Sequence, residues 1–280
     1  MAYLEFTAGQ TGYFDPKAMV SKGAELNDEY TSADPFAHIQ IDDFLPREML
    51  DQCLAKFPTA PDPESVSFDR SQERFKTSYH PDYLDPTIRA FFYSLNSAPF
   101  IQFLENMTGI KGLMPDPYFL GGGFHQTTNG GHLDVHADFN KHPKLGVERR
   151  LNLLLYLNSE WESAYGGELE LWDEQMQSCV RRITPQFNRC VVFSTDEHSY
   201  HGHPIPVNHP NEIPRRSIAI YYYTATFDAT KRKYTTQFKV RPESEDQIDW
   251  QVRRRELMLD LLPPFVVRHF ARAKLKLSGK

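Results

Sequence analysis

Four ionisable side chains alternate along one short segment, and all four are of types that bind metal ions. The segment GGHLDVHADFN places His132, Asp134, His136 and Asp138 at every second position. In an extended strand these side chains would share one face. A His-x-Asp pair on such a face has its Cα atoms about 6–7 Å apart, which allows both side chains to bind one ion. With a third histidine the pattern predicts a facial metal triad, and without one it is a polar strand face exposed to water.

A histidine-rich turn follows an apolar segment further along the chain. The apolar run RCVVFS (189–194) leads into FSTDEHSYHGHPIP (193–206), which contains His201 and His203. Either histidine is placed to be the third ligand.

The segment RRSIAIYYY (215–223) carries a charge where a strand is expected to begin. Period two puts Arg215, Ser217, Ala219 and Tyr221 on one strand face. An arginine that opens a barrel strand is costly to bury without an anion, and a dicarboxylate ligand would remove that cost through a bidentate pair.

The elements that must position these residues are mainly strands. Gly, Asn, Pro and Asp clusters separate runs of β-forming residues from about Tyr118 onward, as in an antiparallel sandwich or small barrel. The clearest strands are 151–158, 167–172, 189–194 and 216–226. Helices are expected over 45–58 and over 85–108, the second broken near Pro99, and again after Arg241 before a basic tail. The pattern predicts a mainly β protein with flanking helices, of the α+β class.

Composition excludes several classes of protein. The 280 residues carry 31 basic and 37 acidic side chains, a net charge of −6, so no nucleic-acid partner is expected. No basic leader and no run of about 18 apolar residues is present, which argues against a membrane span. Three widely spaced cysteines fit neither a disulfide framework nor a zinc site. We therefore expect a cytoplasmic protein with reduced thiols.

Over residues 118–225 the chain resembles the iron(II)- and 2-oxoglutarate-dependent dioxygenases, within them the prolyl 4-hydroxylase-like branch. The shared pattern is a glycine-rich lead into His-x-Asp, a distal histidine after a strand end, and Arg-x-Ser opening the next strand. The resemblance implies a double-stranded β-helix core of the jelly-roll or cupin kind. The organisation expected is N-terminal helical and lid elements over 1–117, the core over 118–228 and a helical extension over 229–280, all in one structural domain.

The family spacing also selects among the candidate metal ligands. Its glycines precede the metal histidine by about five residues, which favours His136 and Asp138 over the pair at 132 and 134. The distance from the strand-end Phe193 favours His201 over His203. The connection from His201 to Arg215 is longer than is usual in the family, which indicates a bulged loop at the rim of the site.

Binding of the cosubstrate is assigned by the same resemblance. The residues implied are Arg215, Ser217, Tyr156, Gln126, Leu154 and Leu169. Arg215 is also counted as catalytic, together with His136, Asp138 and His201. His125 lies beside Gln126 in the sequence, and for it a structural role in the core is the favoured reading.

The implied activity is hydroxylation of an unactivated C–H bond in an amino acid, a peptide or protein residue, or another small molecule. The implied cofactors are iron(II), 2-oxoglutarate and dioxygen, with ascorbate as a reductant, and 2-oxoglutarate becomes succinate and carbon dioxide. Two alternatives stay open: a non-catalytic cupin-type protein that binds a metal or ligand, and a degenerate oxygenase that serves as a scaffold. Whether the protein forms a homodimer is also left open. Residues 59–83 are expected to form either a lid over the site or an ordinary surface loop.

Overall fold

The computed structural model describes residues 2–225, 234–244, 246 and 250. Its helices are α1 (Pro16–Glu25), α2 (Asn27–Thr31), α3 (Arg47–Ala55), η1 (Pro81–Tyr83), α4 (Pro86–Leu95), α5 (Ala98–Thr108) and η2 (Ser163–Tyr165). Its strands are β1 (His38–Ile41), β2 (Val66–Arg70), β3 (Glu73–Tyr79), β4 (Met114–Pro115), β5 (Gly123–Ala137), β6 (Glu148–Tyr156), β7 (Leu169–Trp172), β8 (Cys179–Ile183), β9 (Cys190–Ser194), β10 (His201–His203), β11 (Arg215–Thr224) and β12 (Gln237–Phe238).

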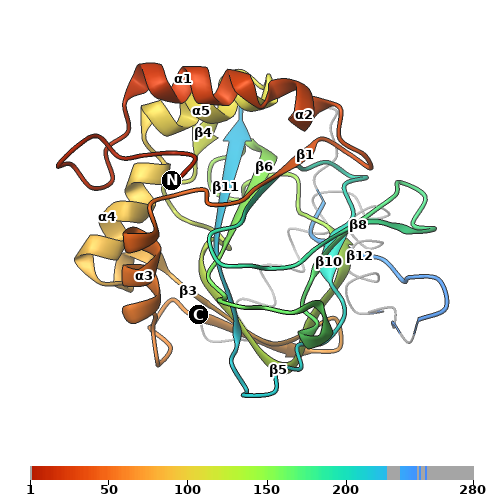
Figure 1. Ribbon diagram of the computed structural model, residues 1–280. Coiled ribbons are helices and arrows are strands. Elements are labelled where there is room, and N and C mark those ends of the chain that lie inside the picture. Colours follow the sequence, from red (N-terminus) through yellow and green to blue (C-terminus); the bar gives the residue numbers. More distant parts are fainter. Residues whose placement is uncertain (1, 226–233, 245, 247–249, 251–280) are drawn as a thin grey trace, which may run out of the picture.

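The strands form one curled antiparallel sheet. Its main path runs β1-β9-β6-β11-β5-β10-β7-β8, and β3, β4 and β12 pair onto this path from the side. The path curls round on itself, as Figure 1 shows. This is the double-stranded β-helix that was predicted, and the expected strands appear as β6, β7, β9 and β11.

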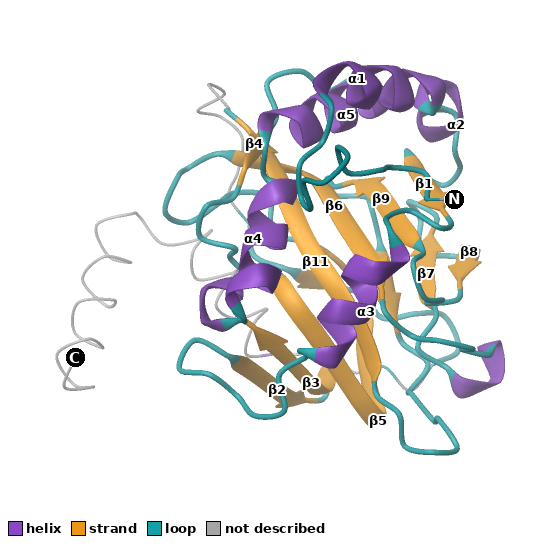
Figure 2. Cartoon of the chain, turned by 60° about the vertical axis from the view of Figure 1, so that its left-hand side comes forward, coloured by secondary structure: helices purple, strands orange, loops and turns teal. Residues whose placement is uncertain are grey.

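The helices cover the outer face of this wrap. Figure 2 shows α3 and α4 lying across β5, β6 and β11, with α1 and α5 packed together above them. Proline opens both α4 and α5, and Asp85 caps α4 through the Thr87 amide. The helices expected around 45–58 and 85–108 are therefore present, and the second is divided at residues 96–97.

Strand alternation divides the apolar core from the interior of the wrap. On β6, Leu151, Leu153 and Leu155 face the helices and belong to the large apolar core. Leu154 and Tyr156 point to the opposite face of the strand and pack in a separate interior cluster. The same alternation on β11 sends Ile218, Ile220 and Tyr222 into the core and leaves the intervening residues for the interior.

The N-terminal segment contributes strands as well as helices. β1 pairs with β9, so residues 38–41 extend the sheet. Residues 59–83, expected to be a loop or a lid, instead contain the β2–β3 hairpin, and β3 pairs with β5 along much of its length. The hairpin therefore contributes side chains to the wall of the interior, and a lid role for it stays a prediction.

The helices expected after residue 241 lie outside the described residues, apart from short stretches up to residue 250. Within the described residues no helix has the length and apolar character needed to cross a membrane. The three cysteines are unpaired thiols.

Burial makes the helix-facing side of β6 a sensitive point for stability. Leu153 has 0% of its surface exposed, whereas Leu145 is 42% exposed. We expect Leu153→Ala to lower the free energy of unfolding by about 2–5 kcal/mol, because a cavity remains between sheet and helices. Leu145→Ala, the matched control, should change it by less than about 0.5 kcal/mol. Urea unfolding of both variants measures the difference, and equal losses would contradict this packing.

Candidate metal centre

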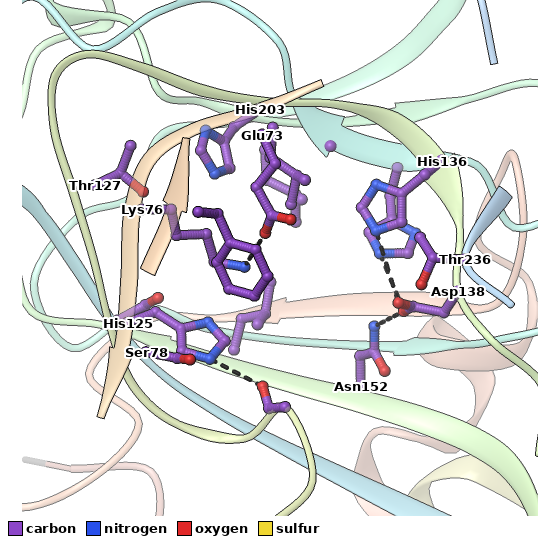
Figure 3. Close-up of a pocket in the computed structure, with 18 of the residues that line it drawn as sticks. Glu73, Lys76, Ser78, His125, Thr127, His136, Asp138, Asn152, His203 and Thr236 are labelled. Carbon is purple, nitrogen blue, oxygen red and sulfur yellow. Dashed lines mark hydrogen bonds and ion pairs between the residues drawn. The ribbon is translucent and has the colours of Figure 1, made fainter. Parts of the chain in front are cut away.

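Two strands bring three buried metal-ligating side chains together inside the wrap. His136 lies on β5, Asp138 follows the end of that strand, and His201 opens β10, which pairs with β5 at His136. One potential ligand atom from each side chain lies within 4.8 Å of the other two. The His136 and His201 Nε2 atoms are 3.6 and 3.3 Å from Asp138 carboxylate oxygens. Figure 3 shows the ring of His136 beside Asp138 at one side of the cavity.

Backbone carbonyl groups fix the orientation of both imidazole rings. Each Nδ1 atom lies 2.9 Å from a carbonyl oxygen two residues earlier, that of Asp134 for His136 and that of Ser199 for His201. With the proton on Nδ1, each Nε2 lone pair is directed toward Asp138, as is usual for histidines that bind metals. Burial lowers the pKa of His201, which keeps this ring neutral at pH 7. Two neutral imidazoles and one carboxylate suit an iron(II) ion with open coordination positions.

Arg149 and Asn152 of β6 hold the carboxylate of Asp138. The Arg149 guanidinium is 3.0 Å from Asp138 Oδ2, and the Asn152 side-chain amide donates to the same oxygen at 2.7 Å. Asn152 also accepts two hydrogen bonds from Arg149, at 2.9 and 2.7 Å. Burial alone would raise the pKa of Asp138, but the positive charge of Arg149 holds it well below its usual range. Asp138 is therefore ionised, and its Oδ1 atom remains available to a metal.

The rival pair at 132 and 134 lies outside this cluster. The expectation that all four alternating residues share one face is wrong, because β5 shifts register against β10 between Leu133 and His136. This irregularity brings Leu133 and His136 to the same cavity. His132 instead bonds the Ser71 carbonyl, and its Nε2 atom is 3.5 Å from Asp134. Burial and Asp246 raise the pKa of Asp134 to about 6, unlike that of Asp138.

His203 lines the same cavity but belongs to a different part of it. Its ring is buried, and its Nδ1 atom has no hydrogen-bond partner among the described residues. It is not a member of the cluster whose ligand atoms converge, so the structure places His201, and not His203, beside His136 and Asp138.

Arg215 lies in the cavity without a carboxylate partner among the described residues. It is 5% exposed, and its Nε donates to the Gly167 carbonyl at 2.6 Å. A side chain at Gly167, whose φ is +68°, would meet the arginine Cδ at 2.9 Å, so glycine is required there. Burial lowers the pKa of Arg215, and Tyr156 opposes this shift only in part. Such a guanidinium favours an anion in the cavity.

Tyr156 stands behind this arginine. The guanidinium carbon is 5.0 Å from the centre of the Tyr156 ring, and the tyrosine hydroxyl is buried without a hydrogen-bond partner among the described residues. Burial raises its pKa, so the hydroxyl keeps its proton and can donate. Tyr156 does not itself line the cavity, so a carboxylate bound by Arg215 is the group that would approach its hydroxyl.

The other residues predicted for the cosubstrate lie in two different places. Leu154, Leu169 and Ser217 line the cavity of about 230 Å³, as does His125, whose Nε2 bonds the Gly121 carbonyl. Gln126 lies outside the cavity lining, because alternation turns it to the other face of β5, where it accepts a hydrogen bond from Arg216. The structure therefore gives Gln126 no contact with the site.

Several residues of the site went unnoticed in the sequence. Arg149 and Asn152 are ordinary strand residues, and the one weak signal was that period two puts Asn152 on the same strand face as Leu154 and Tyr156. Glu73 and Lys76 come from β3, which lies in the segment predicted to be a lid or a surface loop. The alternation in ERFKTSY was the available signal for that strand.

Comparison with known proteins gives a family match and a fold match. A family model described as the 2OG-Fe(II) oxygenase superfamily matches residues 122–223. No curated protein matches the chain significantly. A prolyl hydroxylase from Trichoplax adhaerens, solved with a peptide fragment of a hypoxia-inducible factor, shares 18% identity and a TM-score of 0.51, over 73% of this chain and 90% of that one.

Two further solved structures cover similar shares of the chain. A Pseudomonas putida prolyl-4-hydroxylase has 19% identity and a TM-score of 0.49, over 73% of this chain and 99% of that one. HygX from Streptomyces hygroscopicus, solved with nickel, 2-oxoglutarate and hygromycin B, has 12% identity and a TM-score of 0.48, over 72% and 93%. At such identities the likeness concerns the fold.

The bonds to Asp138 predict that Asn152 supports metal binding without touching the metal. Asn152→Leu removes one donor to Asp138 and the acceptor that orients Arg149. We expect affinity for manganese(II), measured by titration calorimetry, to fall about 10- to 100-fold. The exposed control Asn211→Leu should match the unmodified protein. Unchanged metal affinity in Asn152→Leu would contradict the role given to this network.

Proposed function

We propose that this protein is an enzyme that hydroxylates a C–H bond of an amino acid, a peptide or protein residue, or another small molecule, because residues 122–223 match the model of the 2OG-Fe(II) oxygenase superfamily. One observation carries the proposal. The cavity that holds His136, Asp138 and His201 also holds the buried guanidinium of Arg215, which lacks a carboxylate partner among the described residues. A metal site and an anion site therefore share one enclosed space.

These residues fit the cofactors of the superfamily. His136, Asp138 and His201 offer two neutral imidazoles and one carboxylate for iron(II). A dicarboxylate that chelates the metal at one end presents its distal carboxylate to Arg215, with the Tyr156 hydroxyl as a second donor. The apolar side chains of Leu154 and Leu169 line the space for the carbon chain of 2-oxoglutarate.

When bound, iron(II), 2-oxoglutarate and dioxygen supply an oxidative decarboxylation that yields succinate, carbon dioxide and a hydroxylated substrate. The chain itself orients and protects this chemistry. Arg149 and Asn152 keep Asp138 ionised and fixed, and the carbonyl groups of Asp134 and Ser199 orient the two histidines. The ligand side chains are buried within the curled sheet, and burial strengthens each of these interactions.

A non-catalytic cupin-type binding protein is the second candidate. It would need the metal cluster but not a buried arginine that is unpaired within the described residues. Arg215 and the unpartnered Tyr156 hydroxyl support the oxygenase, since both are satisfied by one carboxylate. A degenerate scaffold would not need a complete set of buried ligands. We also propose a cytoplasmic location, because three unpaired cysteines suit a reducing compartment.

Separate anion and metal sites predict that one variant can remove the cosubstrate and keep the metal. Arg215→Met should weaken 2-oxoglutarate binding to the manganese(II)-loaded protein at least tenfold, because a charge-assisted pair is lost. Metal affinity should stay within about threefold of the unmodified protein, since Arg215 is not a ligand. Titration calorimetry measures both affinities.

The exposed Arg181→Met serves as the matched control and should change neither affinity. If Arg215→Met bound 2-oxoglutarate as tightly as the unmodified protein, the distal carboxylate would not lie where we place it.

A further inference from the structure

Two cationic side chains share one row of the cavity wall. Thr127 on β5 pairs with Arg215 of β11 on one side and with Lys76 of β3 on the other, and all three line the cavity. Neighbouring strands are about 4.8 Å apart, so the Cα atoms of Lys76 and Arg215 are separated by about 10 Å. The cavity therefore offers anions two positions and not one.

The cosubstrate needs only one of these positions. 2-Oxoglutarate has a single distal carboxylate, and under the proposed function this group goes to Arg215. Arg215 has no carboxylate partner among the described residues, whereas Lys76 already has Glu73, so Arg215 is the better position for the distal carboxylate. The donors of Lys76 that Glu73 does not use therefore remain for another molecule.

The wall around Lys76 carries surplus positive charge. Glu73 lies between two cations, since its Oε1 is 3.0 Å from Lys76 Nζ and its Oε2 is 2.8 Å from an Arg70 guanidinium nitrogen. One carboxylate cannot neutralise both. Lys76 is largely buried, with 13% of its side chain exposed. Its ammonium group has three donors, and in the described residues its one hydrogen bond is to Glu73.

A buried and unpartnered polar atom lies beside these charges. Three residues before Lys76 on β3, Glu73 pairs with Leu133 of β5, and Leu133 pairs with His203 of β10. The Nδ1 atom of His203 has no hydrogen-bond partner among the described residues. Figure 3 shows Lys76, Thr127 and His203 across the cavity from His136 and Asp138. A buried polar atom without a protein partner favours a ligand group or a water molecule beside it.

Two phenyl rings line the cavity beside Arg70. The Arg70 guanidinium carbon lies 5.6 Å from the centre of the Phe68 ring and 5.7 Å from that of Phe238. Glu73 and Lys76 have only 6% and 13% of their side chains exposed, and low exposure strengthens the attraction of an anion.

We propose that Lys76, with Arg70 and His203, binds an anionic group of the primary substrate, a carboxylate or a phosphate, across the cavity from the metal. The inference rests on the proposed function and narrows its substrate to molecules that carry such a group. Binding there would hold the remainder of the substrate between this wall and the metal centre.

The test uses the intact protein loaded with manganese(II) and saturating 2-oxoglutarate, which occupies the Arg215 position. Sodium acetate and inorganic phosphate are titrated separately by calorimetry, and the tighter of the two identifies the group. We expect at least one of them to bind. Lys76→Met should weaken that binding at least tenfold, while Lys76→Arg keeps it within about threefold.

Glu73→Gln is expected to change the affinity for the anion in the opposite direction. It removes the carboxylate that competes for Lys76 and Arg70, so it should strengthen anion binding. Lys76→Met leaves Glu73 paired with Arg70 and should fold, and the exposed Lys111→Met is the control expected to bind as the unmodified protein does. The affinity for 2-oxoglutarate should be unchanged in Lys76→Met.

Three results would overturn the inference. If the loaded protein bound neither anion, the subsite would not exist. Equal binding by Lys76→Met would show that the anion sits elsewhere, and displacement of 2-oxoglutarate by the anion would place it at Arg215. If 2-oxoglutarate itself failed to bind the manganese(II)-loaded protein, the proposed function would fail first, and this inference with it.

Discussion

The site depends on keeping one carboxylate ionised inside a closed sheet. Asp138 is buried, and burial by itself opposes its negative charge. Arg149 supplies the opposing charge at 3.0 Å, and Asn152 fixes both groups by bonding each of them. A buried pair of this kind is costly unless its hydrogen bonds are complete, and here β6 supplies both partners. Without this arrangement a divalent ion would lack its only anionic ligand in the cluster.

The rest of the fold can be understood as support for that carboxylate. Alternation along β6 sends Leu151, Leu153 and Leu155 to the helices and Asn152 to the interior. The strand that holds Asp138 in place is thus anchored by the apolar core on its other face. β11 follows the same rule, with Ile218 and Ile220 in the core and Arg215 in the cavity. Packing on the outside therefore sets positions on the inside.

Much of this arrangement was predictable from the sequence, because it follows the period of two. The alternation in RRSIAIYYY placed Arg215 and Ser217 on one face, and the structure shows both in the cavity. The cluster of His136, Asp138 and His201 followed from the spacing of a known family, and the structure brings these three side chains together. That these three residues bind iron stays a prediction.

The remaining features could not be read from local patterns. The shift in register on β5 depends on pairing with β10, some 65 residues later in the chain, so the separation of Asp134 from His136 was not visible. Gln126 lies on the face opposite to that of His125 and Thr127, and which of these two faces lines the cavity depends on how β5 is placed in the sheet. Lys76 and Glu73 gain their importance only when the hairpin pairs with β5, since in isolation they read as exposed charges.

The central claim is that one cavity binds iron(II) and 2-oxoglutarate together, the cosubstrate chelating the metal. The most direct measurement is the visible absorption of metal-free protein after anaerobic addition of iron(II) and 2-oxoglutarate. The account predicts a weak charge-transfer band that requires both additions and is absent from Asp138→Ala. Iron binding without that band would contradict the account and favour a protein that binds metal without using the cosubstrate.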